Sequence, residues 1–159
     1  MENVIFRRSV KEDIPFINAL FIEMVKTVNA RMRDAGTEPY TELENGFEDN
    51  YPDRFYIDDE NLIFVAEYNG RVIGFLSVNR YKESGYIYLD DFCVSAEYRG
   101  KGIGSELIQM AVAFAKEQQI GLILTHVESA NKASIVFYKN RGFQLAEVQG
   151  HRLLIRKAI

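Results

Sequence analysis

Residues 94–104 read Val-Ser-Ala-Glu-Tyr-Arg-Gly-Lys-Gly-Ile-Gly, and this glycine-rich stretch decides how the rest of the chain is interpreted. It follows an apolar run and precedes apolar residues at helical spacing, so it lies where a predicted strand ends and a helix begins. The first turn of a helix exposes unpaired N–H groups and the positive end of the macrodipole, and glycines let a backbone approach a ligand closely. With Arg99 and Lys101, the stretch predicts an anion site, most naturally for a phosphate or pyrophosphate. A tight turn with two exposed cations is the alternative that the spacing alone leaves open.

Other glycine-rich nucleotide loops fit this stretch less well. A P-loop needs Ser or Thr after its Gly-Lys pair, whereas Lys101 is followed by Gly102. A dinucleotide fingerprint that starts at Gly100 needs a glycine where Ser105 stands. The glycine motif of S-adenosylmethionine-dependent methyltransferases lies early in a larger domain, and only 55 residues follow Gly104 here.

Three strands are expected before the glycine-rich stretch, at residues 62–68, 71–79 and 86–94, because these runs are rich in Val, Ile, Leu and Phe. The Asn69-Gly70 pair between the first two is typical of a type I′ hairpin, since both residues tolerate the positive φ that this turn requires. We therefore expect an antiparallel meander.

The N-terminal part predicts a strand at residues 4–8 and a helix that ends near Asp34. Ser9 and Glu12 have the spacing of a capping box, which predicts the start of that helix. Residues 37–60 are irregular, with nine acidic residues against one basic residue and with five aromatic residues. A second, shorter helix is expected inside this acidic segment.

Helices and strands alternate after the glycine-rich stretch. A helix from Ile103 precedes a buried strand at residues 122–127, and a helix that Asn131 begins precedes strands at residues 143–149 and 152–156. The strand–helix–strand unit predicts a parallel, right-handed crossover. The fold class is therefore α/β with a sheet of mixed direction, and residues 1–159 are expected to form a single domain.

Composition narrows the function classes. The chain has 47% hydrophobic and 26% charged residues and a formal net charge of -4, which argues against the broad basic surface that nucleic-acid binding needs. No run approaches the roughly 18 apolar residues of a membrane helix. The single cysteine, Cys93, cannot form an internal disulfide. We expect a cytoplasmic protein with neither a nucleic-acid nor a membrane partner.

Two stretches of the sequence resemble signatures of the GNAT superfamily of acetyltransferases. Residues 94–104 resemble the acyl-CoA signature Val-x-Pro-x-x-Arg-Gly-x-Gly-x-Gly, with Ala96 at the common proline position. Residues 131–143 read Asn-Lys-Ala-Ser-Ile-Val-Phe-Tyr-Lys-Asn-Arg-Gly-Phe and resemble the second signature, in the right order and at the usual distance. The resemblance implies a GNAT fold, with a mixed sheet of about seven strands, a splayed bulge between the fourth and fifth strands, and about four flanking helices.

The same resemblance implies acetyl-CoA as cosubstrate, bound by the glycine loop, by the end of the strand before it and by the helix after Asn131. One face of that helix would carry Asn131, Ser134 and Tyr138, with Ala133, Val136 and Phe137 packing inward. The implied cofactor-binding residues are Phe92, Cys93, Val94, Arg99, Gly100, Lys101, Gly102, Ile103, Gly104, Ser105, Asn131, Ser134 and Tyr138.

An amine that attacks a thioester has to lose a proton, because alkyl ammonium groups have pKa values of about 10. The oxyanion needs fixed N–H donors, and the leaving thiolate benefits from a nearby acid, the role that the resemblance implies for Tyr138. Residues 88–94 also resemble the diamine (spermidine/spermine) acetyltransferases, in which an acidic residue at the position of Asp90 is implicated as the base. Asp91, Glu128 and water stay open as alternatives.

The acidic segment at residues 37–60 favours a cationic acceptor, because carboxylates and aromatic faces attract cations. The acceptor would be a small amine such as a polyamine, an aminoglycoside or a lysine-like amine. A peptide or protein acetyltransferase and a non-catalytic acyl-CoA sensor are the alternatives. His126 and His151 are too few and too far apart in sequence to indicate a metal, and none is expected. Cys93 is expected to be a buried strand residue. Dimers are common in the family that the sequence resembles, so a homodimer is possible.

Overall fold

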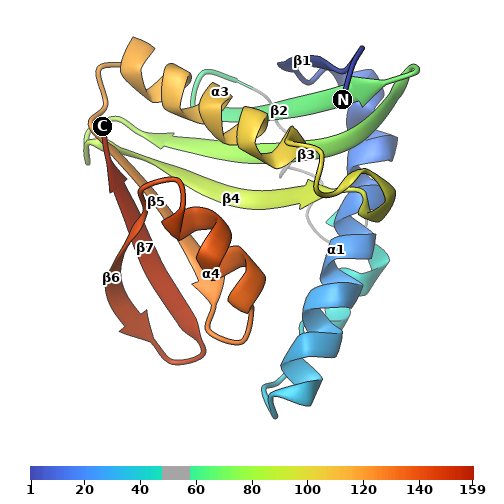
Figure 1. Cartoon of the computed structure of the whole chain (residues 1–159), viewed down its shortest axis with the longest axis vertical. Coiled ribbons are helices and arrows are strands. Elements are labelled where there is room, and N and C mark those ends of the chain that lie inside the picture. Colours follow the sequence, from blue (N-terminus) through green and yellow to red (C-terminus); the bar gives the residue numbers. More distant parts are fainter. Residues whose placement is uncertain (48–57) are drawn as a thin grey trace.

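A seven-stranded sheet organises the computed structural model, which describes residues 1–47 and 58–159 (Figure 1). The strands lie in the order β1-β2-β3-β4-β5-β7-β6, and all neighbours are antiparallel except β4 and β5, which are parallel as predicted. Their bounds are β1 Ile5–Arg8, β2 Asn61–Tyr68, β3 Arg71–Tyr81, β4 Tyr86–Val94, β5 Leu122–Glu128, β6 Gln144–Gln149 and β7 Arg152–Ala158.

Three α-helices are present among the described residues, where about four were expected. They are α1 Ile14–Asp34, α3 Ile103–Glu117 and α4 Lys132–Lys139, and short 3-10 helices include η1 Lys11–Asp13 and η2 Thr41–Asn45. The second helix predicted within residues 37–60 falls partly on residues 48–57, which lie outside the described residues. The described part of that segment holds η2.

The sheet is covered on both faces, by α3 on one and by α1 on the other. Apolar residues of α3 such as Leu107 pack with alternate residues of β2, β3 and β4, and α4 closes the same core with Tyr138. The opposite core joins Phe21 of α1 to Phe75 of β3 and to Phe47, whose ring stacks on Phe21 with centroids 3.4 Å apart. Each such buried side chain stabilises the fold by about 1.5–3 kcal/mol.

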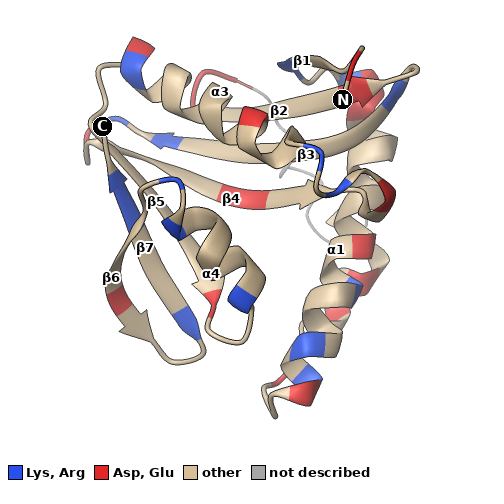
Figure 2. Cartoon of the chain, viewed as in Figure 1, with Lys and Arg blue, Asp and Glu red and all other residues tan. Residues whose placement is uncertain are grey.

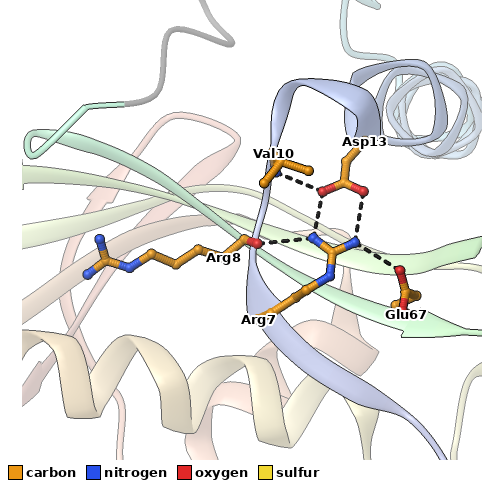
Figure 3. A network of polar contacts seen from close by, with 5 residues as sticks. All are labelled: Arg7, Arg8, Val10, Asp13 and Glu67. Carbon is orange, nitrogen blue, oxygen red and sulfur yellow. Dashed lines mark hydrogen bonds and ion pairs between the residues drawn. The ribbon is translucent and has the colours of Figure 1, made fainter. Parts of the chain in front are cut away.

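Arg7 anchors the N-terminal strand to its neighbours (Figure 3). Its guanidinium donates to both oxygens of Asp13 at 2.7 and 2.9 Å and to Glu67 of β2 at 3.0 Å. The Asp13 carboxylate also accepts from the Val10 N–H at 2.8 Å. The capping box predicted from Ser9 and Glu12 is therefore wrong, since Asp13 supplies the acceptor that holds the turn before α1.

The parallel pair β4–β5 is short, and this opens the sheet. Only Ile87–Leu89 of β4 pair with Ile123–Thr125 of β5, so the two strands part over their last residues. On the other edge of β4, Asp90 and Asp91 both stand opposite the single residue Ser77, which makes a bulge. The splay is confirmed between the fourth and fifth strands, but the bulge lies between the third and fourth strands, at the two residues directly before Phe92.

Candidate active site

A cavity of about 1000 Å³ occupies the opening between β4 and β5. Its walls come from α1, η2 and β4 on one side and from the glycine loop, α3, β5, α4 and β7 on the other. The structure brings together all the predicted site residues except Lys101, which is exposed and does not line the cavity. Those that line it are Asp90, Phe92, Cys93, Val94, Arg99, Gly100, Gly102, Ile103, Gly104, Ser105, Asn131, Ser134 and Tyr138.

The glycine loop has the backbone geometry of an anion cradle. Gly100 and Gly102 have φ values of 74° and 85°, in the left-handed region that other residues rarely adopt. Gly102 is the N-cap of α3, whose hydrogen-bond ladder starts with the Glu106 N–H donating to the Gly102 carbonyl at 3.1 Å. The N–H groups of the first turn precede that ladder and are oriented for a phosphate group. The loop therefore fits the pyrophosphate of coenzyme A.

Two arginines near the loop are fixed by local contacts. Arg99 donates through Nε to the Val94 carbonyl at 2.9 Å, so its side chain turns toward the end of β4. Arg141, which sequence reasoning did not single out, lies over the Phe137 ring at 3.6 Å and donates to the Ser105 hydroxyl. Arg141 thereby joins the end of α4 to the first turn of α3 across the cavity.

Asn131 begins α4 as predicted, but the side chains that follow it pack differently from the prediction. The Asn131 side-chain oxygen accepts the Ser134 N–H at 3.2 Å, so this residue is the N-cap of the helix as well as part of the cavity wall. Ala133 and Val136 are exposed, so the expectation that they pack inward is wrong. Phe137 is partly buried and packs against the core.

Tyr138 is a buried polar residue of the cavity wall, with 6% of its surface exposed. Its ring packs edge-on against Phe143, with centroids 5.1 Å apart. Burial raises the pKa of the Tyr138 hydroxyl, although a hydrogen bond with the Thr125 hydroxyl opposes that rise. The phenol therefore keeps its proton at neutral pH and can donate a hydrogen bond to a negatively charged neighbour.

Carboxylates gather where the strands part, and Figure 2 shows the acidic stretch of β4 in the middle of the sheet. Asp90 and Asp91 both line the cavity, whereas strict strand alternation predicted one of them. The bulge accounts for this, because it adds a residue and breaks the alternation of faces. Glu128 lines the same region and is paired with Arg31 of α1 at 3.2 Å.

Cys93 behaves as the buried strand residue that was expected. It is 4% exposed, and its thiol donates to the Leu20 carbonyl at 3.5 Å. Burial raises the pKa of the Cys93 thiol to about 12. A thiol held in this form is a poor nucleophile.

The acidic segment contributes less to the cavity than the sequence suggested. Its described residues at the cavity are Tyr40 and Leu43, held on α1 by the fully buried Asn29, which bonds the Tyr40 backbone through both N and O. Glu44 accepts from Asn29 at 2.9 Å, and Glu60 is paired with Arg80 at 2.6 Å. None of the segment's described carboxylates lines the cavity, and residues 48–57 lie outside the described residues.

A chain of polar side chains that sequence reasoning missed crosses the two parting strands. The Tyr88 hydroxyl of β4 lies 2.6 Å from Nδ1 of His126 in β5, and His126 Nε2 lies 2.7 Å from Oε1 of Gln149. His126 lines the cavity, as does Arg152 of β7, which is hydrogen-bonded to Tyr88. Tyr88 and His126 are 38 residues apart, so no local spacing could indicate this contact.

Comparison with known proteins gives the family. The sequence model of the acetyltransferase (GNAT) family matches residues 28–143, and the chain belongs to this family. An uncharacterized N-acetyltransferase of Methanocaldococcus jannaschii is 33% identical over 95 residues, which are 57% of this chain and 42% of that protein. Streptothricin acetyltransferase A of Bacillus subtilis is 27% identical over 103 residues, covering 64% of this chain and 59% of that protein. These matches thus span about half the length of both relatives.

A solved structure supports the fold over nearly the whole chain. The PaiA N-acetyltransferase of Thermoplasma acidophilum, in complex with coenzyme A, has a TM-score of 0.78 at 19% identity and covers 99% of each chain. The predicted GNAT fold is confirmed. Across residues 1–47 and 58–159, no helix is long and apolar enough to cross a membrane, and no three His, Cys, Asp or Glu residues are grouped to hold a metal.

Proposed function

We propose that the chain transfers the acetyl group of acetyl-CoA to a primary amine of a cationic small molecule. The observation that carries this proposal is the cavity that runs through the splayed sheet, with the glycine loop at one end and three carboxylates at the other. Both reactants can then meet between β4 and β5 by direct attack, without a covalent enzyme intermediate.

Two sets of backbone groups in this chain bind the coenzyme. The first-turn N–H groups of α3 bind its pyrophosphate, while the freed edge of β4 at Phe92, Cys93 and Val94 offers backbone groups to its pantetheine arm. Acetyl-CoA supplies the activated thioester. A β4 N–H directed at the thioester oxygen stabilises the negative charge that develops there.

Tyr138 is the proton donor in this proposal. The leaving thiol has an ordinary pKa of about 8.5, so a donor that stays protonated near neutral pH favours its departure. The Tyr138 hydroxyl is protonated at neutral pH and lines the cavity, so it can donate a hydrogen bond to the thiolate as the C–S bond breaks.

The balance of charge at the far end of the cavity favours a cationic acceptor. Asp90, Asp91 and Glu128 stand there with Arg31 and Arg152, so carboxylates outnumber guanidinium groups by one. Arg31 is already paired with Glu128. Asp90 and Asp91 add two further negative charges, which attract an ammonium group. The similarity to streptothricin acetyltransferase A also favours a small-molecule acceptor.

The test has a binding arm and an acceptor arm. Calorimetry should detect micromolar acetyl-CoA binding by the wild type and none by Gly102→Glu. Gly85→Glu is the matched control, because Gly85 has a similar φ of 79° and equally open space but lies in a turn away from the cavity. Spermidine, kanamycin, L-lysine and an alanine-initiated peptide then serve as acceptors. No coenzyme binding by folded wild type would sink the proposal.

The acceptor arm separates the rival functions. Transfer to the peptide alone would indicate a peptide or protein acetyltransferase, and binding without transfer to any amine would favour a sensor. Asp90→Asn and Asp91→Asn should raise KM for the cationic acceptor about tenfold, whereas Glu60→Gln, outside the cavity, should not. Unchanged KM in both aspartate variants would remove the case for a cationic acceptor.

A further inference from the structure

The hydrogen-bonded chain from Tyr88 to Glu147 is a feature that acetyl transfer by Tyr138 and Asp90 leaves unused. Tyr88 is in contact with His126 at 2.6 Å, His126 with Gln149 at 2.7 Å, and Gln149 Nε2 with Glu147 at 2.8 Å. The chain runs from the parting strands β4 and β5 to the exposed edge strand β6. Tyr88 lies two residues before Asp90, in the last part of β4 that pairs with β5.

Donor and acceptor roles along the chain follow from its far end. A carboxylate only accepts, so the Gln149 amide donates to Glu147 and turns its oxygen toward His126. His126 must then donate from Nε2, which leaves the lone pair of its neutral ring on Nδ1. Tyr88 donates to that lone pair, and burial raises the pKa of its phenol, so the proton stays on Tyr88.

This arrangement leaves one way for a proton to reach the imidazole from the cavity. The basic nitrogen of His126 is covered by the Tyr88 hydroxyl, so any proton it takes up has to pass through the Tyr88 oxygen. His126 Nε2 faces the exposed side, from which the proton can leave to solvent. The charged and titratable groups around the pair are Asp90 and Asp91 of β4, Glu128 of β5, Glu147 of β6, Arg152 of β7, Tyr138 of α4 and Arg31 of α1.

We propose that Tyr88 and His126 form the relay that removes a proton from the acceptor amine, a role that rests on the proposed acetyl transfer. His126 lines the cavity but Tyr88 does not, so one water carries the proton to the Tyr88 oxygen. The ammonium N–H bond breaks as this water takes the proton, and an O–H bond of the water breaks as the Tyr88 oxygen takes a proton in turn. The original Tyr88 O–H bond breaks as its proton forms the Nδ1–H bond of His126. Tyr88 ends neutral, His126 becomes an imidazolium, and the freed lone pair of the amine attacks the thioester.

Basicity favours this relay over the carboxylate predicted from the sequence. An alkyl ammonium ordinarily has a pKa of about 10, an imidazolium of about 6.5 and an aspartic acid of about 3.9. Transfer to an imidazole is therefore several hundredfold less unfavourable than transfer to a carboxylate. Asp90 and Asp91 then hold the ammonium group in place, and the imidazole accepts its proton.

Kinetics across pH test the relay. With the fastest-reacting amine of the panel, Tyr88→Phe and His126→Gln should lower kcat about 100-fold at pH 7 and recover toward wild type near pH 10, where the amine is already neutral. Acetyl-CoA affinity should not change. Tyr86→Phe is the control, because Tyr86 lies on the same strand but stacks on Tyr81. A kcat within threefold of wild type in both variants, or a loss that high pH does not restore, would overturn the relay.

Nuclear magnetic resonance gives a readout that needs no acceptor. The chain has two histidines, so His151→Gln leaves a single imidazole to observe. Nitrogen-15 shifts should show the neutral His126 ring protonated at Nε2, and the opposite tautomer would overturn the relay. A wild type that acetylates no panel amine would instead overturn the proposed function, so the two failures are distinct.

Discussion

Close packing requires glycine at position 104, because a side chain there would be crowded; its backbone conformation is one that any residue can adopt. A Cβ at this position would lie 3.0 Å from the Phe92 ring, closer than packed atoms normally approach, and 3.5 Å from the Phe137 ring, an ordinary contact. Gly104 therefore lets the first turn of α3 sit against the aromatic wall of the cavity. Gly102, two residues earlier, differs: the space around it is open, and its φ of 85° is what favours glycine there.

The Gly104→Ala variant should separate coenzyme binding from stability. The crowded Cβ should push α3 away from Phe92 and lower acetyl-CoA affinity about tenfold, since overpacking costs about 1–3 kcal/mol. The gain in helix propensity of about 1 kcal/mol offsets part of this cost to folding. Calorimetric titration and denaturant unfolding measure both effects. Gly121→Ala, whose nearest neighbour is 3.7 Å away, should change neither; equal affinity in the two variants would contradict this account.

Tyr138→Phe should reduce turnover while leaving the fold intact. The phenylalanine ring keeps the packing against Phe143, so the loss is confined to the hydroxyl with its proton and its hydrogen bond to Thr125, and kcat should fall about 100-fold with little change in KM. Because burial raises the pKa of Tyr138 above its ordinary value of about 10, wild-type kcat should show no decline from Tyr138 ionisation below about pH 10. A pH profile of kcat checks both statements. Activity of Tyr138→Phe equal to that of Tyr81→Phe, at an exposed site, would exclude Tyr138 as the acid.

At the scale of elements, the ion pair of Arg7 and Asp13 links β1, η1 and β2, and its strength should depend on pH. The hydrogen bond from Arg7 lowers the pKa of Asp13, against the opposing effect of burial. Because the pKa of Asp13 is lower in the folded than in the unfolded chain, where it is about 3.9, the ionised carboxylate stabilises the fold at pH values above 3.9. This stabilisation is lost as the pH falls through the pKa of the folded state.

Asp13→Asn should therefore lower the free energy of unfolding by about 2 kcal/mol at pH 7, and the difference from wild type should shrink below about pH 4. Urea unfolding at several pH values measures it. Glu12→Gln should stay within about 0.5 kcal/mol of wild type, since Glu12 is exposed and is not the cap. A larger loss for Glu12→Gln than for Asp13→Asn would restore the capping box predicted from Ser9 and Glu12.

Patterns among neighbouring residues predicted the helices and strands better than they predicted which strands pair with one another. The Asn69-Gly70 turn indicated the hairpin of β2 and β3 because its φ requirement is encoded in adjacent residues. The insertion of β7 between β5 and β6 follows from antiparallel pairing of segments far apart in sequence, which no local pattern carries. The bulge placed both Asp90 and Asp91 at the cavity for the same reason, since Ser77 of the neighbouring strand defines it.

At the scale of the whole molecule, the sheet consists of two parts, β1 to β4 and β5 with β7 and β6, joined by a short parallel pairing. Thr125 reinforces that junction by donating to the Leu89 carbonyl at 2.7 Å. Side chains bridge the opening on each face, Arg141 to Ser105 on the α3 face and Arg31 to Glu128 on the α1 face. A ligand that fills the cavity would contact both parts.

Acetyl-CoA should consequently stabilise the chain as a whole. At 100 times its Kd, a ligand that binds only the folded state adds about 2.7 kcal/mol, which for a chain of this size raises Tm by roughly 5–10 °C. Scanning calorimetry should show this rise in wild type and in Gly85→Glu but not in Gly102→Glu. Each variant places a side chain at positive φ, at a cost of about 1–2 kcal/mol, so their ligand-free Tm values should fall alike. An equal rise in Gly102→Glu would mean that the coenzyme binds without the glycine loop.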